Sequence, residues 1–361
     1  MLILGIESSC DDTGVAIVED GKRVLASCVS NQTTIHAAFG GVVPEIAARE
    51  HLSNIYPLFE EALHLAGIKA EELGAIAVTQ GPGLVGALLV GISFAKGLAS
   101  SLAVPLIPVD HVHAHIHGAL LALPAETVVS SLFPGLALVV SGGHTHLYLM
   151  TSAISFTLLA SSVDDACGEC FDKVAKIMGL PYPGGPVIER LARQGRLARF
   201  PMPRMLANKK QRAFSYSGLK THMATLIRNL PPLDEQTKAD LACGFQEEAF
   251  GQIIRKVKLI AGDLPYPLQS LLVAGGVAAN GRFRELLQAE LGGEKGAGGE
   301  RMKQGLVPSL YFPRLEYCAD NGAMIAAYGW YRMLEGGASQ NFAAQSWDAY
   351  SSYRYAKSEA G

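Results

Sequence analysis

The chain has 361 residues, of which 49% are hydrophobic and 17% are charged, and its formal net charge is −3. A chain of this length can form two lobes, each with its own core. The small negative charge gives no global reason to expect a nucleic-acid partner, so any such partner must be bound by a local surface. The six cysteines are scattered along the chain, which excludes the dense disulfide framework of small secreted proteins.

Two features of the sequence predict a soluble, cytoplasmic protein without a membrane partner. Apolar runs are interrupted by glycine, serine or a charge before they reach the ~18 residues that a membrane span needs. The segment from Met1 to Glu7 has no basic start and soon reaches an acid, so a buried first strand is a better interpretation than a secretory signal.

A polar loop between two apolar segments occurs twice in the sequence. The loop 7–14 follows the first apolar segment, and the loop 141–146 separates residues 136–140 from residues 147–150. Such loops can offer backbone N–H groups and hydroxyls to a phosphate, although one alone is better explained as a well-capped hairpin. Two matching loops favour a duplicated fold with a nucleotide cleft between its halves.

Helices and strands are expected to alternate between the two loops. An amphipathic helix begins at Pro44, residues 75–78 form a buried strand, and a glycine cluster at 81–86 opens a helix over residues 87–99. The glycine cluster could hold an anion at the helix N-terminus, and close packing against a sheet explains it equally well. This order favours parallel strands with helices on both faces.

Four histidines alternate along one short segment that follows an apolar run, at His111, His113, His115 and His117. In a strand all four imidazoles would share one face, whereas a helix would pair the first with the third and the second with the fourth. Asp110 is a favourable N-cap, and the residues after the segment are apolar and helix-prone. We therefore predict a helix that begins at Asp110, with His111 and His115 one turn apart.

Cys167 and Cys170 form a C-x-x-C pair, which can be a redox centre or half of a zinc site. There is no second pair, and no Trp and Pro lie beside this one, so cysteines packed in a helix interface are the favoured interpretation.

Two later segments could let a ligand approach the backbone closely. The turn 181–186 combines proline with a glycine pair, and a second glycine pair at 275–276 follows a buried strand. Asn280, which comes just after that pair, could contact a ribose or a base edge.

The segment from Arg190 to Lys220 is basic and contains no Asp or Glu. Its basic residues are Arg190, Arg193, Arg196, Arg199, Arg204, Lys209, Lys210, Arg212 and Lys220. A solvated face is the usual explanation of a charged run. Like charges without a partner are costly, however, and Phe200, Phe214 and Tyr216 interleave with them, which suits phosphate neutralisation and base stacking. The segment therefore favours RNA binding.

The sequence contains an ordered set of motifs, at Gly5–Gly14, Gly41–Glu45, Gly81–Gly83, Asp110-His111 with His115, Val140–Thr145, Phe171–Lys173, Tyr182–Pro186, Phe214–Lys220, Gly275–Asn280 and Asp320-Asn321. Together they resemble the TsaD (formerly Gcp) family of tRNA threonylcarbamoyltransferases. Any one of these motifs is weak evidence, but the ordered set is specific and extends to about Trp330.

The resemblance implies an α/β fold, namely the duplicated fold shared by actin, sugar kinases and heat-shock chaperones (the ASKHA fold), with two lobes around a nucleotide cleft. We expect a first lobe over residues 1–120, completed by a C-terminal helix over 320–335. A second lobe over 121–319 would carry the basic segment 190–220, and residues 336–361 would form a polar tail.

The resemblance also implies that His111, His115 and Asp320 hold one divalent metal ion, either iron or zinc. Two imidazoles one helical turn apart and a distant carboxylate would leave coordination positions open for a ligand. Because Asp320 lies near the far end of the sequence, we expect the metal to join the two halves. The resemblance implies no functional role for His113 or His117.

The residues that the resemblance assigns to the adenylate substrate are Val139, Val140, Ser141, Gly142, Gly143, Asp172, Gly185 and Asn280. Glu189 stands where some members have an acid that contacts the nucleotide. The alanines that often flank Gly168-Glu169 in the family are Cys167 and Cys170 here, a departure that puts no catalytic role in doubt.

The implied reaction moves a threonylcarbamoyl group from threonylcarbamoyl-AMP to the exocyclic amine of the adenosine 3′ of the anticodon, in tRNAs that read codons starting with A. That amine is a poor nucleophile because its lone pair is delocalised, so the donor must be an activated mixed anhydride. Asp11 and Glu7 lie on the kind of loop that could provide a general base. The expected tRNA contacts are Arg190, Arg193, Arg196, Arg199, Lys209, Lys210 and Arg212.

The implied partners are tRNA, a degenerate paralogue similar to TsaB, a small ATPase similar to TsaE, and the synthase of threonylcarbamoyl-AMP; ATP with magnesium could also bind. A phosphotransferase or ATPase is an alternative, since the fold serves both activities. Kinases of this fold hold magnesium mainly through carboxylates, so the histidines favour the transferase. A metalloprotease is the weakest alternative, because no H-E-x-x-H motif occurs.

Overall fold

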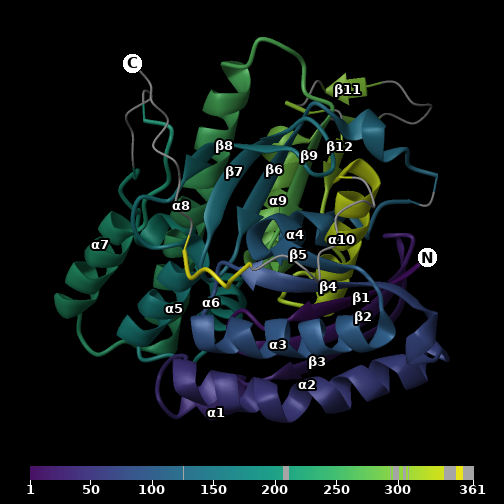
Figure 1. Ribbon diagram of the computed structural model, residues 1–361. Coiled ribbons are helices and arrows are strands. Elements are labelled where there is room, and N and C mark those ends of the chain that lie inside the picture. The colour runs from purple at the N-terminus through teal and green to yellow at the C-terminus, as the bar shows by residue number, and fades with distance from the viewer. Residues whose placement is uncertain are drawn as a thin grey trace, which may run out of the picture. The chain divides into compact units, whose positions relative to one another are not determined.

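The structure is a computed structural model that describes residues 1–124, 126–205, 211–292, 294–295, 301–303, 306–307, 309–336 and 347–352 (Figure 1). The chain divides into two compact units. Unit 1 consists of Met1–Leu121 and Asp320–Gly361, and unit 2 consists of Ala122–Ala319.

Unit 1 is built on a five-stranded sheet, with strands β1 (Leu2–Glu7), β2 (Asp12–Glu19), β3 (Arg23–Asn31), β4 (Leu73–Gly81) and β5 (Leu106–Asp110). Their order across the sheet is β3-β2-β1-β4-β5. Strands β1, β2 and β3 pair antiparallel, whereas β4 and β5 are added parallel to β1. The first strand predicted from the apolar N-terminus is thus the centre of the sheet.

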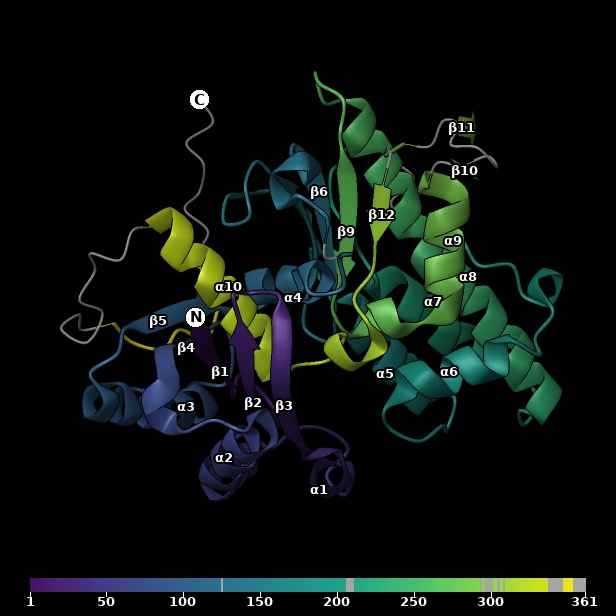
Figure 2. The ribbon, with the colours of Figure 1, turned by 90° about the vertical axis from the view of Figure 1, so that its right-hand side faces the viewer.

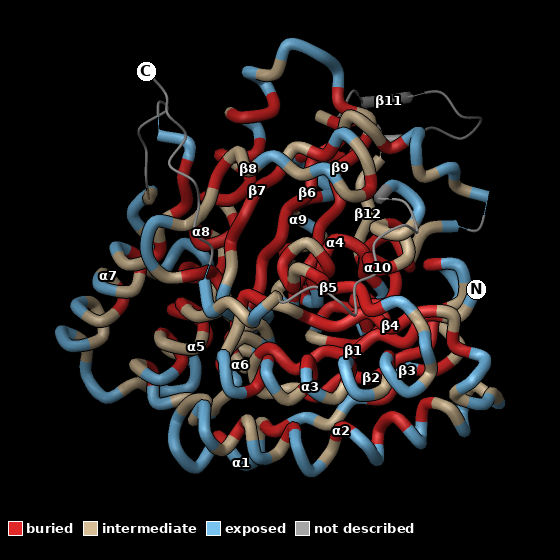
Figure 3. Tube along the Cα trace, viewed as in Figure 1, coloured by how far each residue is buried: buried red, intermediate tan, exposed pale blue. Residues whose placement is uncertain are grey.

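Helices cover both faces of this sheet, which explains why the central strands are buried on both sides (Figures 2 and 3). The helices of unit 1 are α1 (Thr33–Ala37), α2 (Pro44–Ala66), the short 3₁₀ turn η1 (Ala70–Glu72), α3 (Val85–Leu102), α4 (His111–Leu120) and α10 (Gly322–Gly336). Helices α2 and α3 pack on one face, and α10 packs on the other.

Glycines allow α10 to approach the sheet closely. A Cβ atom at Gly5 in β1 would overlap the carbonyl oxygen of Gly322, and one at Gly14 in β2 would lie 2.7 Å from the amide nitrogen of Gly322. Because no side chain fits between these backbones, the start of α10 is fixed against the sheet, together with the residues that precede it.

Helix α3 corrects the expectation that no apolar run is long enough to span a membrane. Its 18 residues have a mean hydropathy of 1.6, and it is the one helix in the described part of the chain that is long and apolar enough. A single such helix is weak evidence for a membrane span, because core helices of soluble proteins pass the same test. Here α3 packs on α2 and β4.

Unit 2 repeats the topology of the first sheet. Its five-stranded sheet consists of β6 (Gly135–Val140), β7 (Thr145–Met150), β8 (Phe156–Ser161), β9 (Ser270–Ala274) and β12 (Ser309–Tyr311), in the order β12-β9-β6-β7-β8. Strands β6, β7 and β8 pair antiparallel, and β9 and β12 are added parallel to β6. The duplication predicted from the two polar loops is therefore confirmed.

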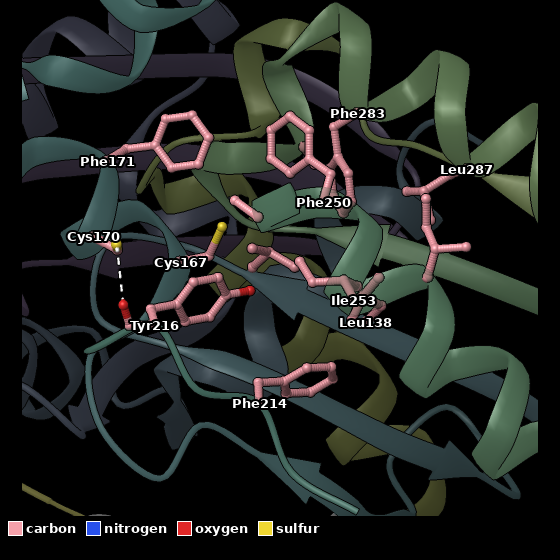
Figure 4. Close-up of a cluster of buried hydrophobic side chains, with 14 of the residues drawn as sticks. Leu138, Cys167, Cys170, Phe171, Phe214, Tyr216, Phe250, Ile253, Phe283 and Leu287 are labelled. Atoms are coloured by element: carbon pink, nitrogen blue, oxygen red, sulfur yellow. Dashed lines mark hydrogen bonds between the residues drawn. The ribbon is translucent and has the colours of Figure 1, made fainter. Parts of the chain in front are cut away.

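The other elements of unit 2 are α5 (Cys167–Ile177), α6 (Gly184–Ala192), α7 (Ser217–Arg228), α8 (Glu235–Gly262), α9 (Gly281–Leu291), β10 (Glu294–Lys295), β11 (Arg301–Lys303), and the 3₁₀ turns η2 (Val129–Leu132), η3 (Leu197–Arg199), η4 (Gly276–Ala279) and η5 (Leu315–Tyr317). Figure 4 shows part of the core of this unit, where Phe171 stacks on Phe250 with ring centroids 5.4 Å apart.

The C-x-x-C pair belongs to this core, in agreement with the packing interpretation. Cys167 and Cys170 are free thiols and are fully buried, and the Cys170 thiol donates to the carbonyl oxygen of Tyr216 at 3.8 Å (Figure 4). Burial raises the pKa of Cys167 to about 12. Thiols that remain protonated at neutral pH are poor nucleophiles and poor metal ligands.

The expected polar tail is only partly polar. Trp347 and Ala349 pack against the apolar core of unit 1. The remainder of the tail, residues 337–346 and 353–361, lies outside the described residues.

Candidate functional site

Helix α4 places two histidines side by side, as predicted. The Oδ1 atom of Asp110 accepts a hydrogen bond from the His113 backbone N–H at 2.9 Å, which makes Asp110 the N-cap. The rings of His111 and His115 lie one turn apart, with centroids separated by 4.7 Å and planes at 74°. The helical interpretation of the histidine segment is confirmed.

Asp320 lies next to this pair, two residues before the start of α10. Its Oδ1 atom is 3.3 Å from Nε2 of His115 and 3.6 Å from Nε2 of His111. Taking one ligand atom from each residue, all three atoms lie within 4.8 Å of one another. The side chains thus form a compact group that could hold a metal ion.

All three residues of this group belong to unit 1, which corrects the expectation that a metal would join the two halves. Asp320 is distant in sequence, but α10 returns to the sheet of unit 1 and packs on β1 and α4. Sequence separation was therefore a poor guide to which half contributes the third side chain.

Glu7 at the end of β1 orients His111. Its carboxylate is fully buried and accepts hydrogen bonds from the Ser9 backbone N–H at 2.6 Å and from the Thr79 hydroxyl at 2.5 Å. It also lies 3.0 Å from Nδ1 of His111. A carboxylate can only accept, so this contact places a ring proton on Nδ1 and turns Nε2 toward Asp320.

This geometry argues against Glu7 as a general base, because its oxygens are buried and occupied. Burial alone would raise the pKa of Glu7, but the charge of His111 and its hydrogen bond outweigh that effect, so the pKa lies below its ordinary value. Glu7 is better described as a positioning residue. Asp11, the other proposed base, is partly exposed in the loop between β1 and β2.

The surroundings of the histidine pair are strongly negative. Although burial lowers it, the pKa of His111 is raised to about 9 by Glu7 and Asp320. Burial, followed by the charges of Asp320 and Asp11, raises the pKa of Asp12 to about 7. Sequence reasoning missed Asp12, which follows Asp11 at the start of β2. A site that holds protons this strongly would also attract a cation.

His113 and His117 lie on the other side of α4, against α10. The ring of His117 stacks on Tyr328 with centroids 4.4 Å apart, and the ring of His113 meets the edge of Tyr328 at 6.4 Å. Both histidines therefore pack between helices, outside the His111, His115 and Asp320 group.

A pocket of about 200 Å³ lies within unit 2. It is lined by Gly142, Gly168, Phe171, Asp172, Pro183, Gly185, Pro186, Glu189, Gly276, Val277, Ala279 and Asn280. The pocket brings together five residues that the resemblance assigned to the adenylate, namely Gly142, Asp172, Gly185, Glu189 and Asn280. Since ligand pockets usually measure ~300–1,000 Å³, it could enclose only part of a nucleotide.

Four other predicted substrate residues are not among the lining residues of this pocket: Val139, Val140, Ser141 and Gly143. The side chains of Val139 and Val140 are buried in β6, so only their backbone could meet a ligand. Of the lining residues that were missed, Pro183, Pro186, Gly276, Val277 and Ala279 lie in or directly after the two glycine-rich segments that the sequence singled out, whereas Gly168 and Phe171 lie in α5.

Close backbone contacts shape this pocket. A Cβ atom at Gly168 in α5 would lie 2.7 Å from the carbonyl oxygen of Ser141. Gly275 has a φ of 89°, and a Cβ atom there would overlap the carbonyl oxygen of Val140. The end of β6 is thus fixed between α5 and the turn after β9. Gly142, which follows β6 and lines the pocket, is fixed by the same contacts.

The polar side chains of the pocket also serve the fold. Asn280 caps α9 by accepting from the Phe283 backbone N–H at 3.0 Å, and its amide donates to Gln246 at 3.0 Å. Asp172 accepts from the Gly184 backbone N–H at 2.7 Å. An amide has two donor hydrogens and two acceptor lone pairs, so Asn280 keeps capacity for a ligand.

The basic segment is not an uncompensated field, which corrects the argument from its composition. Acids outside the segment pair with several of its charges: Arg193 with Glu189 at 2.8 Å, Arg196 with Asp240 at 2.7 Å, Arg212 with Asp263 at 2.9 Å, and Lys220 with Asp165 at 2.5 Å. Arg190, Arg199 and Arg204 are exposed. Lys209 and Lys210 lie outside the described residues.

Comparison with known proteins identifies the family. The TsaD family model, described as tRNA N6-adenosine threonylcarbamoyltransferase, matches residues 23–327. A curated protein of that name from Moorella thermoacetica is 44% identical over 333 residues, which cover 92% of each chain. Another, from Carboxydothermus hydrogenoformans, is 45% identical over 337 residues, which cover 93% of each chain.

A solved structure supports the predicted fold. Component A of the (R)-2-hydroxyglutaryl-CoA dehydratase from Acidaminococcus fermentans is 16% identical and aligns with a TM-score of 0.50, over 92% of this chain and 99% of that one. At this identity the likeness concerns the fold alone. Together with the repeated sheets, it confirms the duplicated ASKHA fold.

Because the family model matches most of the chain and the relatives are of near-equal length, the chain belongs to the TsaD family of tRNA N6-adenosine threonylcarbamoyltransferases.

Proposed function

We propose that this tRNA N6-adenosine threonylcarbamoyltransferase works with one divalent metal ion, iron or zinc, held by His111, His115 and Asp320. The observation that carries the proposal is the state of His115. Its ring is 1% exposed and neither ring nitrogen makes a hydrogen bond, although Nε2 lies 3.3 Å from Oδ1 of Asp320. A buried polar atom without a partner is costly, and a metal bond to Nε2 would remove that cost.

The donor set fits such an ion. Two imidazole nitrogens and one carboxylate are ligands that both iron and zinc accept, and three protein ligands leave positions open for a substrate. The Glu7 carboxylate fixes His111 in the tautomer that presents Nε2. When bound, the ion would supply Lewis-acid stabilisation of the negative charge that develops on the donor.

In the proposed reaction, the N6 nitrogen of adenosine forms a bond to the carbamoyl carbon of threonylcarbamoyl-AMP. The anhydride bond to phosphate then breaks, AMP leaves, and the nitrogen loses a proton. We assign the proton acceptor to the stretch that joins β1 to β2, where Asp11 in the loop and Asp12 at the start of β2 are partly exposed. Glu7 is excluded from that role by its burial.

The pocket of unit 2 is the proposed binding site for the adenylate. Its glycines, Gly142, Gly185 and Gly276, let a ligand approach the backbone, and Asp172, Glu189 and Asn280 offer polar groups. ATP with magnesium could occupy the same kind of site, as in other proteins of this fold.

Gly185 provides a test of the pocket. A Cβ atom there would meet no other heavy atom within 4 Å, so Gly185→Ala should fold normally and narrow the pocket. We expect the KM for threonylcarbamoyl-AMP to rise about tenfold or more while the thermal stability stays unchanged. Gly262→Ala, on α8 and equally open, is the control. An unchanged KM in Gly185→Ala would contradict the assignment.

The basic segment remains the proposed tRNA-binding surface, now limited to its exposed charges. We expect Arg190→Ala to weaken tRNA binding and to reduce the slope of log affinity against log salt by about 1. Arg196→Ala should instead lower thermal stability, because it leaves the Asp240 carboxylate buried without its cation. The affinity for tRNA, measured between about 50 and 200 mM salt, distinguishes the two variants. Affinity that does not change with salt would count against this surface.

The outer face of α2 is the proposed docking surface for a paralogous protein of the same fold. Leu52 and Tyr56 lie one turn apart on it and are 70% and 54% exposed. Further proposed partners are a small ATPase and the synthase that makes the adenylate. We also propose that the protein acts in the cytoplasm, without a membrane partner.

One reconstitution tests the whole proposal. The protein is incubated with candidate partners, ATP, threonine, bicarbonate and unmodified tRNA, and the tRNA nucleosides are analysed by mass spectrometry. We expect threonylcarbamoyladenosine at the position 3′ of the anticodon, and only when the protein holds its metal. Full modification by metal-free protein would refute the metal assignment while leaving the transferase activity intact.

A further inference from the structure

The C-terminal segment Trp347–Ser352 returns to unit 1, although the family match ends at residue 327. In Figure 1 it is the short yellow segment beside the ends of β4 and β5. The Tyr350 hydroxyl donates a hydrogen bond to Oδ2 of Asp110 at 2.6 Å. We call Trp347–Ser352 the C-terminal strap.

Asp110 is the junction between β5 and the histidine helix. Its Oδ1 atom caps α4 through the His113 N–H at 2.9 Å, and its Oδ2 atom accepts from Tyr350. His111 is the next residue in the chain. A group that holds the Asp110 carboxylate therefore also fixes the point at which His111 leaves the strand and enters the helix.

Several independent contacts hold the strap in place. The Tyr350 backbone N–H donates to the carbonyl oxygen of Gln80 at 3.3 Å, and the Gln80 side chain donates to the carbonyl oxygen of Asp348 at 2.9 Å. Lys96 of α3 donates to the carbonyl oxygen of Trp347 at 3.3 Å and lies 4.8 Å from the centre of its ring. The apolar side of Trp347 packs against the core of unit 1.

Gly81 at the end of β4 is matched to the strap. A Cβ atom at this position would lie 2.9 Å from the Tyr350 ring and would overlap the Tyr350 carbonyl oxygen. The first glycine of the cluster at 81–86 therefore leaves room for the strap. This glycine therefore has a packing role, but its contact is with the C-terminal strap and not with a helix.

We propose that Tyr350 is a positioning residue for the transfer reaction: through Asp110 it holds the start of α4, and thereby the orientation of His111. The inference rests on the metal site proposed above. Its basis is the chain of contacts from the core, through Trp347 and Gln80, to Tyr350, Asp110 and α4. The C-terminal strap lies outside the family match, and it helps to hold the histidine helix in place.

Tyr350→Phe is the sharpest test, because it removes the hydroxyl and keeps the ring that packs on Gly81. We expect the release of metal to a chelator to become about 3- to 10-fold faster. This is a smaller effect than the ~10–100-fold loss of metal affinity expected when the hydrogen-bond partner of a metal ligand is changed. We also expect kcat to fall while the KM for tRNA is unchanged. Tyr266→Phe, an exposed tyrosine of unit 2, is the matched control.

Hydrogen exchange provides a readout that does not depend on metal. In Tyr350→Phe, the His113 amide should exchange faster, because its acceptor Asp110 is less constrained. In an Asp110→Asn background, adding Tyr350→Phe should have little further effect, since the two residues act through one contact. A protein truncated after residue 336 should resemble Tyr350→Phe or be more affected.

The outcomes separate this inference from the proposed metal site. If the wild-type protein holds no metal but Tyr350→Phe exposes the His113 amide and lowers kcat, the metal site fails and the positioning role stands. If exchange, metal release and kcat are all unchanged in both Tyr350→Phe and the truncated protein, the positioning role is refuted.

Discussion

Replacing His111 with alanine is expected to remove the proposed metal ion and the transfer activity together. The substitution deletes one of three proposed ligands and leaves Glu7 buried without its partner. Because a metal that stabilises developing charge is worth several kcal/mol, kcat/KM should fall at least about a hundredfold. Metal content is measured by elemental analysis and activity by incorporation of labelled threonine into tRNA.

His113→Ala is the matched control, since His113 lies on the same helix but packs against Tyr328. It should retain one metal ion per chain. Glu7→Gln keeps the shape of the orienting side chain and removes its charge, so metal affinity should fall by about 10–100-fold without loss of the ligands. A metal-free His111→Ala protein with full activity would contradict the assignment.

Gly5→Ala is expected to be the most destabilising conservative change in unit 1. The added methyl would overlap the backbone of α10 at Gly322, and two backbones cannot move apart without opening the core. We expect the free energy of unfolding to fall by about 3 kcal/mol or more, the upper end of overpacking effects. Because Asp320 lies only two residues before α10, affinity for the proposed metal should fall as well. Urea unfolding and metal titration measure the two effects.

Gly97→Ala is the control for this change. Gly97 lies in α3, where a Cβ atom would meet nothing within 4 Å, so alanine should stabilise the protein by about 0.5–1 kcal/mol through its helix propensity. If Gly5→Ala is as stable as Gly97→Ala and binds metal normally, the close packing of α10 does not set the position of Asp320.

Features encoded in neighbouring residues could be predicted from the sequence. Asp110 followed by a helix-prone segment defined the start of α4, and the helical period then separated His111 and His115 from the other two histidines. The two hairpin loops revealed the duplicated sheets, because each loop lies between two strands that are adjacent in sequence. Both kinds of feature depend on contacts within a few residues.

Features that depend on distant partners could not be predicted in this way. The pairing of Arg196 with Asp240 cancels a charge that looked uncompensated within its own segment, and the burial of Glu7 turned a candidate base into the residue that orients His111.

The return of α10 to the first sheet placed Asp320 in unit 1, and the docking of Tyr350 on Asp110 gave the end of the chain a place beside the histidine helix. Local propensities and periodicity decide which segments become helices and strands. Which charges are paired, which acids are buried and which side chains meet is decided only when packing of the core brings distant segments together.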